Sequence, residues 1–198
     1  MRKIGVLALQ GGFAEHIAAL EKLDVEAVPV RVSGELAGLA GLVIPGGEST
    51  TITRLMTEDS LAQAVKGRIT GGLPVLGTCA GMVLLARKVS GSSQKTLNAI
   101  DIEVRRNAFG RQVDSFEADL EVPALGGGPF HAIFIRAPWI EKVGNGVEVL
   151  SRLPDGVPVA AREGNLVVTA FHPELTTDLR LHSYFLSIVD GKRKAKTA

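Results

Sequence analysis

Cys79, the only cysteine of the chain, lies in the segment Gly77-Thr78-Cys79-Ala80-Gly81, between a short apolar run and a stretch of helix formers. Small residues on both sides permit the sharp strand-to-helix turn of a nucleophile elbow, here with cysteine in place of serine. Positive partial charge at the start of the following helix would favour the thiolate, which attacks carbonyl carbons. A buried structural cysteine is the alternative, but the two glycines and the strand-to-helix position favour a nucleophile.

Catalysis by a cysteine requires a base that takes and returns a proton, and this base is usually histidine. The chain contains four histidines. His16 and His182 fall within predicted helices and are interpreted as partly exposed surface residues. His131 opens a predicted strand, where a core or strand-end position would account for it. The fourth, His172, is the candidate base.

His172 follows a predicted strand and precedes Pro173, which favours extended backbone at the histidine. In an extended segment residues two apart point to the same side, so we expect the carboxylate of Glu174 to reach the imidazole. Cys79, His172 and Glu174 would then form a catalytic triad in which the acid orients the ring, by the logic of a serine triad.

Acyl transfer also needs N–H donors aimed at the developing oxyanion. The backbone N–H of Ala80 is one candidate, because it follows the predicted nucleophile. Gly46 and Gly47 offer another, because amides without side chains can approach a substrate closely. A plain glycine turn with Ser49 capping the next helix is a compatible alternative. The segment is not a P-loop, because no Gly-Lys-Ser/Thr follows it.

The elements that must position these residues alternate between strand and helix in the first half of the chain. Apolar runs predict strands at 4–9, 26–30, 42–44 and 74–76. Pro29 favours an edge or a strand end for the second of these. Helices are predicted at 13–23, as a pair over 50–70, and after the elbow. The alternation predicts an α/β fold with a mostly parallel central sheet and helices on both faces.

The second half of the chain predicts further strands and one closing helix. The strands are expected at 100–104, 116–122, 130–135, 157–162 and 166–171, the last two joined by a hairpin turn at 163–165. The closing helix covers 178–190. We therefore expect a single domain over 1–190, followed by a basic tail, 191–198, that is disordered and solvated.

Composition narrows the class of protein. The 198 residues suffice for one domain with a full core, and 22 basic against 21 acidic side chains indicate neither a nucleic acid nor an anionic membrane as partner. A single cysteine cannot form an internal disulfide, and no apolar run has the length of a signal peptide or a membrane span. We expect a cytoplasmic enzyme without metal or cofactor.

The elbow together with His172-Pro173-Glu174 resembles the class I glutamine amidotransferases, which hydrolyse the side-chain amide of glutamine and pass the ammonia to a synthase. Within that superfamily the chain is similar to the family of glutaminase subunits of pyridoxal 5′-phosphate synthase. Six segments carry this similarity: 7–11, 44–52, 105–112, 115–117, 134–138 and 171–175.

The resemblance implies a flavodoxin-like fold, L-glutamine as substrate and, as partner, a (β/α)8-barrel pyridoxal 5′-phosphate synthase subunit. It assigns glutamine binding to Gly47, Glu48, Ser49, Arg106, Ile135 and Arg136. It places Gln10 near the oxyanion loop, at the face that meets the synthase. An arginine can bind a carboxylate bidentately, but the sequence does not separate Arg105, Arg106 and Arg111, for which surface salt bridges are the alternative.

Two other functions stay open at this point. One is the glutaminase subunit of imidazole glycerol phosphate synthase, although that family typically carries Pro-Gly-Val-Gly where this chain has Pro45-Gly46-Gly47-Glu48. The other is a non-enzymatic, flavodoxin-like redox sensor that uses Cys79 as an oxidation switch. Such a sensor has no need of a glycine oxyanion loop or of the pair formed by His172 and Glu174.

Overall fold

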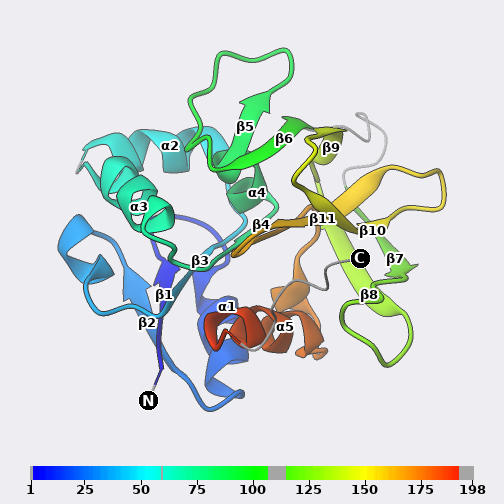
Figure 1. Ribbon diagram of the computed structural model, residues 1–198, viewed down its shortest axis with the longest axis horizontal. Coiled ribbons are helices and arrows are strands. Elements are labelled where there is room, and N and C mark those ends of the chain that lie inside the picture. Colours follow the sequence, from blue (N-terminus) through cyan, green and yellow to red (C-terminus); the bar gives the residue numbers. More distant parts are fainter. Residues whose placement is uncertain (1, 59, 107–114, 192–198) are drawn as a thin grey trace.

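The computed structural model describes residues 2–58, 60–106 and 115–191 (Figure 1). Arg111 lies outside the described residues, and so does the predicted basic tail apart from Gly191. No helix within the described ranges is long and apolar enough to cross a membrane.

A central sheet organises the molecule, and the described residues contribute seven strands to it in the order β10-β11-β12-β4-β3-β1-β2. The strands are β1 (Lys3–Leu7), β2 (Glu26–Val30), β3 (Gly41–Ile44), β4 (Val75–Thr78), β10 (Glu148–Arg152), β11 (Pro158–Glu163) and β12 (Leu166–Thr169). The five strands from β2 to β12 pair in parallel, and β11 and β10 add two antiparallel strands. The predicted mostly parallel sheet is confirmed, and β2, which contains Pro29, lies at its edge as expected.

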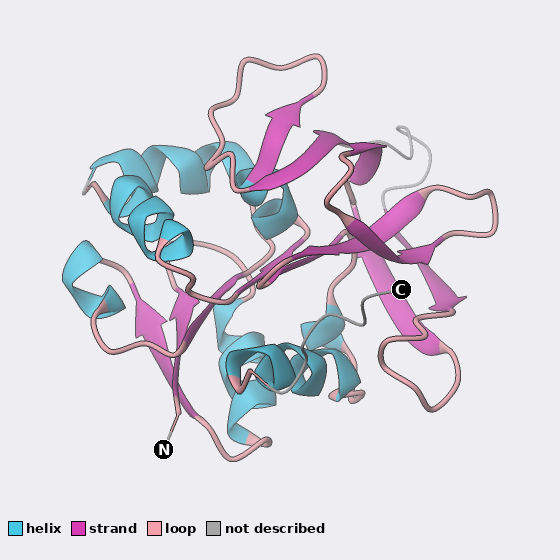
Figure 2. Ribbon diagram, in the orientation of Figure 1, coloured by secondary structure: helices cyan, strands magenta, loops and turns pink. Residues whose placement is uncertain are grey.

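Helices cover both faces of this sheet (Figure 2). Helices α1 and α5 lie on one face, and α2, α3 and α4 lie on the other (Figure 1). Their bounds are α1 (Phe13–Glu21), α2 (Ser49–Glu58), α3 (Leu61–Thr70), α4 (Ala80–Leu85) and α5 (Arg180–Val189). The predicted helix pair over 50–70 is therefore confirmed as α2 and α3.

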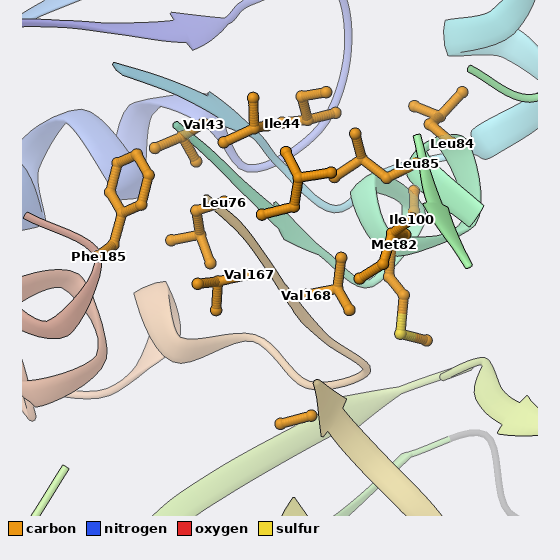
Figure 3. Close-up of a cluster of buried hydrophobic side chains, with 14 of the residues drawn as sticks. Val43, Ile44, Leu76, Met82, Leu84, Leu85, Ile100, Val167, Val168 and Phe185 are labelled. Carbon is orange, nitrogen blue, oxygen red and sulfur yellow. The ribbon is translucent and has the colours of Figure 1, made fainter. Parts of the chain in front are cut away.

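The core explains the uninterrupted apolar runs in the sequence, because β3, β4 and β12 are buried along their full length. Successive strand residues point to opposite faces, so both faces must be apolar when helices cover both. Figure 3 shows this alternation in β12, where Val167 points toward Phe185 of α5 and Val168 toward Met82 of α4. The core thus fixes β4, and with it the position of the segment that follows.

Two smaller sheets complete the fold within the described residues. One pairs β5 (Ala86–Val89), β6 (Ile100–Arg105) and β9 (Trp139–Val143), and the other is the hairpin of β7 (Ser115–Leu120) and β8 (Phe130–Ile135). The hairpin turn between β11 and β12 is confirmed, since Glu163 pairs with Leu166. The sequence does not predict β5, β9 or β10, because charged or polar residues interrupt these short, partly exposed strands.

Candidate active site

Cys79 lies at the junction of β4 and α4, with φ 49° and ψ −102°. A positive φ is rare for a residue with a Cβ and costs about 1–3 kcal/mol unless the surroundings hold it in place. The surroundings do so here: the Cys79 N–H donates to the Thr169 carbonyl at 2.8 Å, and its carbonyl accepts from the Val83 N–H at 3.3 Å. The predicted strand-to-helix turn is therefore present, and it holds the cysteine in a strained conformation.

The two glycines of the elbow segment are required by close packing. A Cβ on Gly81 would lie 2.0 Å from the carbonyl oxygen of Ile44, and a Cβ on Gly77 would lie 2.8 Å from the backbone of Gly81. Helix α4 therefore starts directly against β3 and β4, with no space for a side chain between them. This contact gives the glycine spacing noted in the sequence its physical cause.

His172 and Glu174 contact each other as predicted, but through a different backbone conformation. The His172 Nδ1 and the Glu174 Oε1 are 2.7 Å apart, and the carboxylate side chain is only 1% exposed. The expectation of an extended segment is wrong beyond His172, because the 3-10 turn η2 (Pro173–Leu175) begins directly after it. The turn, and not strand alternation, brings the carboxylate back to the ring.

The protonation states of His172 and Glu174 depend on their burial and on the side chains that contact them. Burial acts to lower the pKa of His172, but the side-chain hydrogen bonds with Cys79 and Glu174 outweigh it and raise the pKa from 6.5 to about 10. Burial acts to raise the pKa of Glu174, but His16 and His172 hold it well below its usual range. At neutral pH the site thus contains an imidazolium ring beside the cysteine and a buried carboxylate behind the ring.

Two of the three remaining histidines, His16 and His182, differ from their predicted environments. His16 and His182 are not surface residues: both are fully buried, because α1 and α5 bring them together with ring nitrogens 3.0 Å apart. His131 is not in the core, but it is the second residue of β8 and so lies close to the strand end, as one of the two expectations had it. It lies on the exposed side of β8 and pairs with Glu117 and Asp119 of β7 at 2.9 Å each.

The predicted oxyanion loop, which contains Gly46 and Gly47, packs with its backbone against residues 10–12, which follow β1. The Gly12 N–H donates to the Gly46 carbonyl at 3.1 Å, and the Glu48 N–H donates to Oε1 of Gln10 at 2.7 Å. A Cβ on Gly11, which has φ +99°, would lie 1.8 Å from the Gly46 oxygen. Because a trans peptide directs its C=O and N–H to opposite sides, the Gly47 N–H points away from Gly12.

A cavity of about 220 Å³ opens over Cys79. This volume lies below the roughly 300–1,000 Å³ of sites for drug-sized ligands, so a small polar substrate suits it. The cavity brings together most of the predicted site residues: Gln10, Gly47, Glu48, Ser49, Cys79, Ala80, Arg106, Ile135, Arg136 and His172. Gly46 and Glu174 do not line the cavity. Glu174 binds the His172 ring by a hydrogen bond, and the Gly46 backbone packs closely against the same ring. Val83 and Pro138 also line it and were not predicted.

Cys79 lines the cavity, and one wall comes from the end of β8. The Cys79 Sγ is 4.0 Å from the carbonyl oxygen of Ile135. The next residue, Arg136, has φ 43°, so the chain bends sharply beside the cavity. The His172 N–H donates to the Ile133 carbonyl at 2.8 Å, which ties the segment that contains His172 to the same strand.

The structure separates two of the three arginines that the sequence leaves equivalent. Arg106 faces the cavity and binds Oε1 of Glu48 through Nη2 at 2.9 Å. Arg105 points elsewhere and pairs with Glu141 of β9. Partial burial acts to raise the pKa of Glu48, but hydrogen bonds from Thr50 and the charges of Arg106 and Arg136 lower it. Only Arg106 of this pair can meet a ligand in the cavity.

Gln94 supports these charged residues and was missed in the sequence. Its Oε1 accepts from Arg106 Nη1 at 3.0 Å and from Ser49 Oγ at 3.2 Å, and its Nε2 lies 3.3 Å from Thr53 Oγ1. Gln94 belongs to a loop without regular structure, so no periodicity in the sequence indicated its role.

The burial of His16, in contrast, did have a signal in the sequence, because His16 shares its helix face with Phe13 and Leu20.

Relatives of assigned function match nearly the whole chain. A protein of Moorella thermoacetica described as pyridoxal 5′-phosphate synthase subunit PdxT is 59% identical over 187 residues, which are 94% of this chain and 99% of that protein. The PdxT protein of Dehalococcoides mccartyi is 62% identical over 188 residues, which are 94% of this chain and 96% of that protein. Residues 6–190 match the SNO glutamine amidotransferase family.

Two solved structures share the fold of this chain, one of them at high sequence identity. A crystal structure described as a glutamine amidotransferase has a TM-score of 0.90 and 50% identity, and the match covers 94% of this chain and 98% of that one. A structure of PurLQS from Thermotoga maritima shares the fold, with a TM-score of 0.69 and 15% identity over 94% of this chain and 97% of that one. The family match over residues 6–190 agrees with the relatives that span nearly the whole chain. The chain belongs to the SNO glutamine amidotransferase family.

Proposed function

We propose that the chain is the glutaminase subunit of a pyridoxal 5′-phosphate synthase, and that it hydrolyses L-glutamine to L-glutamate and ammonia. The observation that carries this proposal is the joint position of Cys79, His172 and the Arg106–Glu48 ion pair on one small cavity. The names of the relatives support the choice of synthase, because proteins 52–62% identical to this chain are described as subunits of that enzyme.

Glutamine binding follows from the charges on the cavity wall. The substrate carries a carboxylate and an ammonium group on its α-carbon, and the cavity offers the Arg106 guanidinium and the Glu48 carboxylate. Arginine binds carboxylates with two parallel hydrogen bonds, so we assign the α-carboxylate to Arg106 and the ammonium to Glu48. Gly47, Ser49, Ile135 and Arg136 complete the binding surface, which leaves the side-chain amide directed toward Cys79.

The reaction then proceeds through a thioester. The Cys79 thiolate attacks the amide carbon, the N–H groups of Ala80 and of the Gly46–Gly47 segment stabilise the oxyanion, and the His172 imidazolium gives its proton to the leaving ammonia. The neutral imidazole next takes a proton from water, the hydroxide attacks the thioester, and glutamate leaves as the thiolate re-forms. The raised pKa of His172 suits this cycle, because it supplies the ring as the acid at neutral pH.

Glu174 keeps the imidazole in position during both steps. Its carboxylate binds Nδ1, which leaves Nε2 as the ring nitrogen that exchanges the proton. The partner subunit, expected to be a (β/α)8 barrel, receives the ammonia. Gln10 lies on the cavity and holds the Glu48 N–H, so it is placed to transmit docking of that partner to the oxyanion loop.

The alternative functions have less support. The relatives named above are described as parts of pyridoxal 5′-phosphate synthase, and the chain carries Gly47-Glu48 where the imidazole glycerol phosphate synthase family typically has Val-Gly. A redox sensor would leave the cavity and its Arg106–Glu48 pair without a role.

The test is ammonia release from glutamine by the chain mixed with a pyridoxal 5′-phosphate synthase subunit. We expect Cys79→Ala to abolish release while the fold and the binding of the synthase persist. Mass spectrometry of the quenched wild-type complex should detect a glutamyl adduct on Cys79. Ammonia release above a trace by Cys79→Ala would exclude Cys79 as the nucleophile, and no release by the wild-type complex would refute the proposed function.

A further inference from the structure

One oxygen of the buried Glu174 carboxylate is held differently from the other. Oε1 binds Nδ1 of His172, whereas Oε2 has no hydrogen-bond partner among the described residues. His16 Nε2 is nevertheless only 3.2 Å from Oε2, off the line of a good hydrogen bond. A buried carboxylate oxygen without a donor is costly, so the ring of His16 is the group that compensates for it.

His16 is itself held by two further side chains. Its Nδ1 is 3.0 Å from Nε2 of His182, and its Nε2 is 3.1 Å from Oγ1 of Thr78. His16, His182 and Thr78 are all fully buried, and Thr78 directly precedes the nucleophile. Residues of α1, α5 and β4 therefore meet at the side of Glu174 that faces away from the cavity.

The positions of the protons follow from His182. Burial lowers the pKa of His182 to about 3, so its ring is neutral near pH 7 and carries one N–H. Its Nδ1 has no partner in the described structure, and a buried donor without an acceptor is unfavourable. The proton of His182 thus belongs on Nε2, which donates to Nδ1 of His16, and His16 in turn presents an Nε2–H to Thr78 and Glu174.

We propose that His16 is a positioning residue for the reaction, which fixes the Glu174 carboxylate through its Nε2–H and thereby holds the His172 ring in its catalytic orientation. His182 supports it by fixing the tautomer of His16. The proposal rests on the proposed function, because it assigns His16 a part in the work of the same triad. His16 and His182 do not line the cavity, so glutamine binding should not depend on them.

Other ionisable groups near Glu174 must be counted in any test at varied pH. They are Cys79 at the elbow, His172 on the loop, His182 on α5, and Glu15 on α1. The Glu15 carboxylate is exposed, and it approaches Glu174 across Gly12, where a Cβ would lie 3.6 Å from Glu15 Oε2 and 3.2 Å from Glu174 Oε1. Glu15→Gln is therefore a useful control for electrostatic effects that do not pass through His16.

A matched pair of variants separates positioning from simple packing. In His16→Gln the side-chain amide can place an N–H near the former Nε2, whereas in His16→Asn the amide sits near the former Nδ1 and no donor reaches Glu174. Leu20→Ala, another fully buried change on α1, should lower stability without removing a polar group from the surroundings of the carboxylate. Two readouts apply: the pH profile of glutaminase kcat/KM in the complex, and the titration of His172 by NMR of the histidine-labelled chain alone.

We expect His16→Asn to move the titration of His172 and the alkaline limb of kcat/KM to lower pH. At neutral pH it should lower kcat by roughly tenfold, the low end of the value of a hydrogen bond to a charged group, because the contact is out of line, with KM unchanged. His16→Gln, Glu15→Gln and Leu20→Ala should leave the titration of His172 near its wild-type position. If His16→Asn does not fold, His182→Leu should give a smaller shift of the same sign, because the His16 tautomer is then free.

Equal behaviour of His16→Asn and His16→Gln, or a loss of thermal stability with no shift of the His172 titration, would overturn the proposal. Because the NMR titration needs neither turnover nor a synthase, it also separates failure of this inference from failure of the proposed glutaminase function. No ammonia release from the wild-type complex would count against that function alone.

Discussion

The α-carbon of Gly46 faces the imidazole of His172 so closely that a Cβ added to the glycine would lie 2.3 Å from Cε1 of the ring. The same Cβ would lie 2.9 Å from Nδ1, the nitrogen that binds Glu174. The Gly46 backbone and the His172 ring are therefore in direct contact, and a larger residue at position 46 would displace the ring.

Gly46→Ala should consequently displace the ring of His172. We expect glutaminase activity to fall by about a hundredfold to a thousandfold, comparable to the loss of one oxyanion donor, while the chain still folds. Gly34→Ala is the matched control, because nothing lies within 4 Å of the Cβ it would add. Steady-state ammonia release by both variants in the complex measures the effect, and near wild-type activity of Gly46→Ala would contradict this contact.

The two residues behind Cys79 should differ in their importance. His172→Asn removes the group that carries the proton, so it should be nearly as damaging as loss of the nucleophile, since a triad acts as a unit. Glu174→Gln keeps the shape and removes only the charge that supports the imidazolium, so its kcat should fall less. A larger loss of kcat in Glu174→Gln than in His172→Asn would show that the roles are assigned wrongly.

Stability should depend on pH in two separate windows. The pKa of His172 is raised in the folded chain from 6.5 to about 10, so its contribution to stability is complete below 6.5 and is lost as the pH rises through about 10. The pKa of Glu174 is lowered from 4.5, so its contribution is present above 4.5 and is lost as the pH falls below that value. Thermal unfolding followed over pH should show both declines.

His172→Asn should flatten the alkaline decline of Tm, and Glu174→Gln should flatten the acid decline. If either variant kept the full wild-type decline in its own window, another group would be responsible for it.

Arg106 and Arg105 form a natural test of glutamine binding, because adjacent arginines point to different partners. Arg106→Gln should raise the KM for glutamine by roughly tenfold to a hundredfold, the value of a charge-assisted hydrogen bond. Arg105→Gln removes an exposed ion pair with Glu141 and should leave KM nearly unchanged. Equal changes in KM would argue against a direct contact between Arg106 and the substrate.

Gln10 should matter for activation by the synthase more than for binding of glutamine. Gly46 and Gly47 allow a peptide to turn over at little cost, and Gln10 holds the next N–H, that of Glu48. The free chain should be a poor glutaminase, and docking should raise its rate by about a hundredfold or more if one oxyanion donor is gained. Gln10→Ala in the complex should blunt that rise.

Steady-state rates of the free chain, the complex and the Gln10→Ala complex decide this point. Full activity of the free chain would exclude the switch. Unchanged activation of the Gln10→Ala complex would show that Gln10 has no part in this switch.

Much of the fold was predictable because it is local. The apolar runs of β3 and β4 and the hairpin at 163–165 depend on residues next to one another in the chain. The contact of His172 with Glu174 was also predicted, although Pro173, expected to extend the chain, instead begins a 3-10 turn. The spacing of His172 and Glu174 alone cannot distinguish an extended segment from a 3-10 turn, because both conformations bring side chains two residues apart into contact.

The environment of His16 was not predictable in the same way. A histidine on a helix can be buried only if a partner satisfies its ring nitrogens, and that partner, His182, lies on a helix 166 positions further along the chain. Gln94 is a similar case, since its role depends on how an irregular loop returns to Ser49 and Arg106. Such pairings are decided by tertiary packing: the helix face that His16 shares with Phe13 and Leu20 indicates burial, but no local pattern identifies the partner.

The place of β4 in the sheet also determines how firmly Cys79 is held when the fold fluctuates. β4 lies between β3 and β12, and the ladder with β12 continues past the strand through the Cys79 N–H to Thr169. Native proteins open first at their edges and last at their central strands, as amide hydrogen exchange reports. We therefore expect β2 and β10 to fray and re-form while Cys79 stays anchored to the central strands, so partial opening of the molecule should leave its sulfur in place.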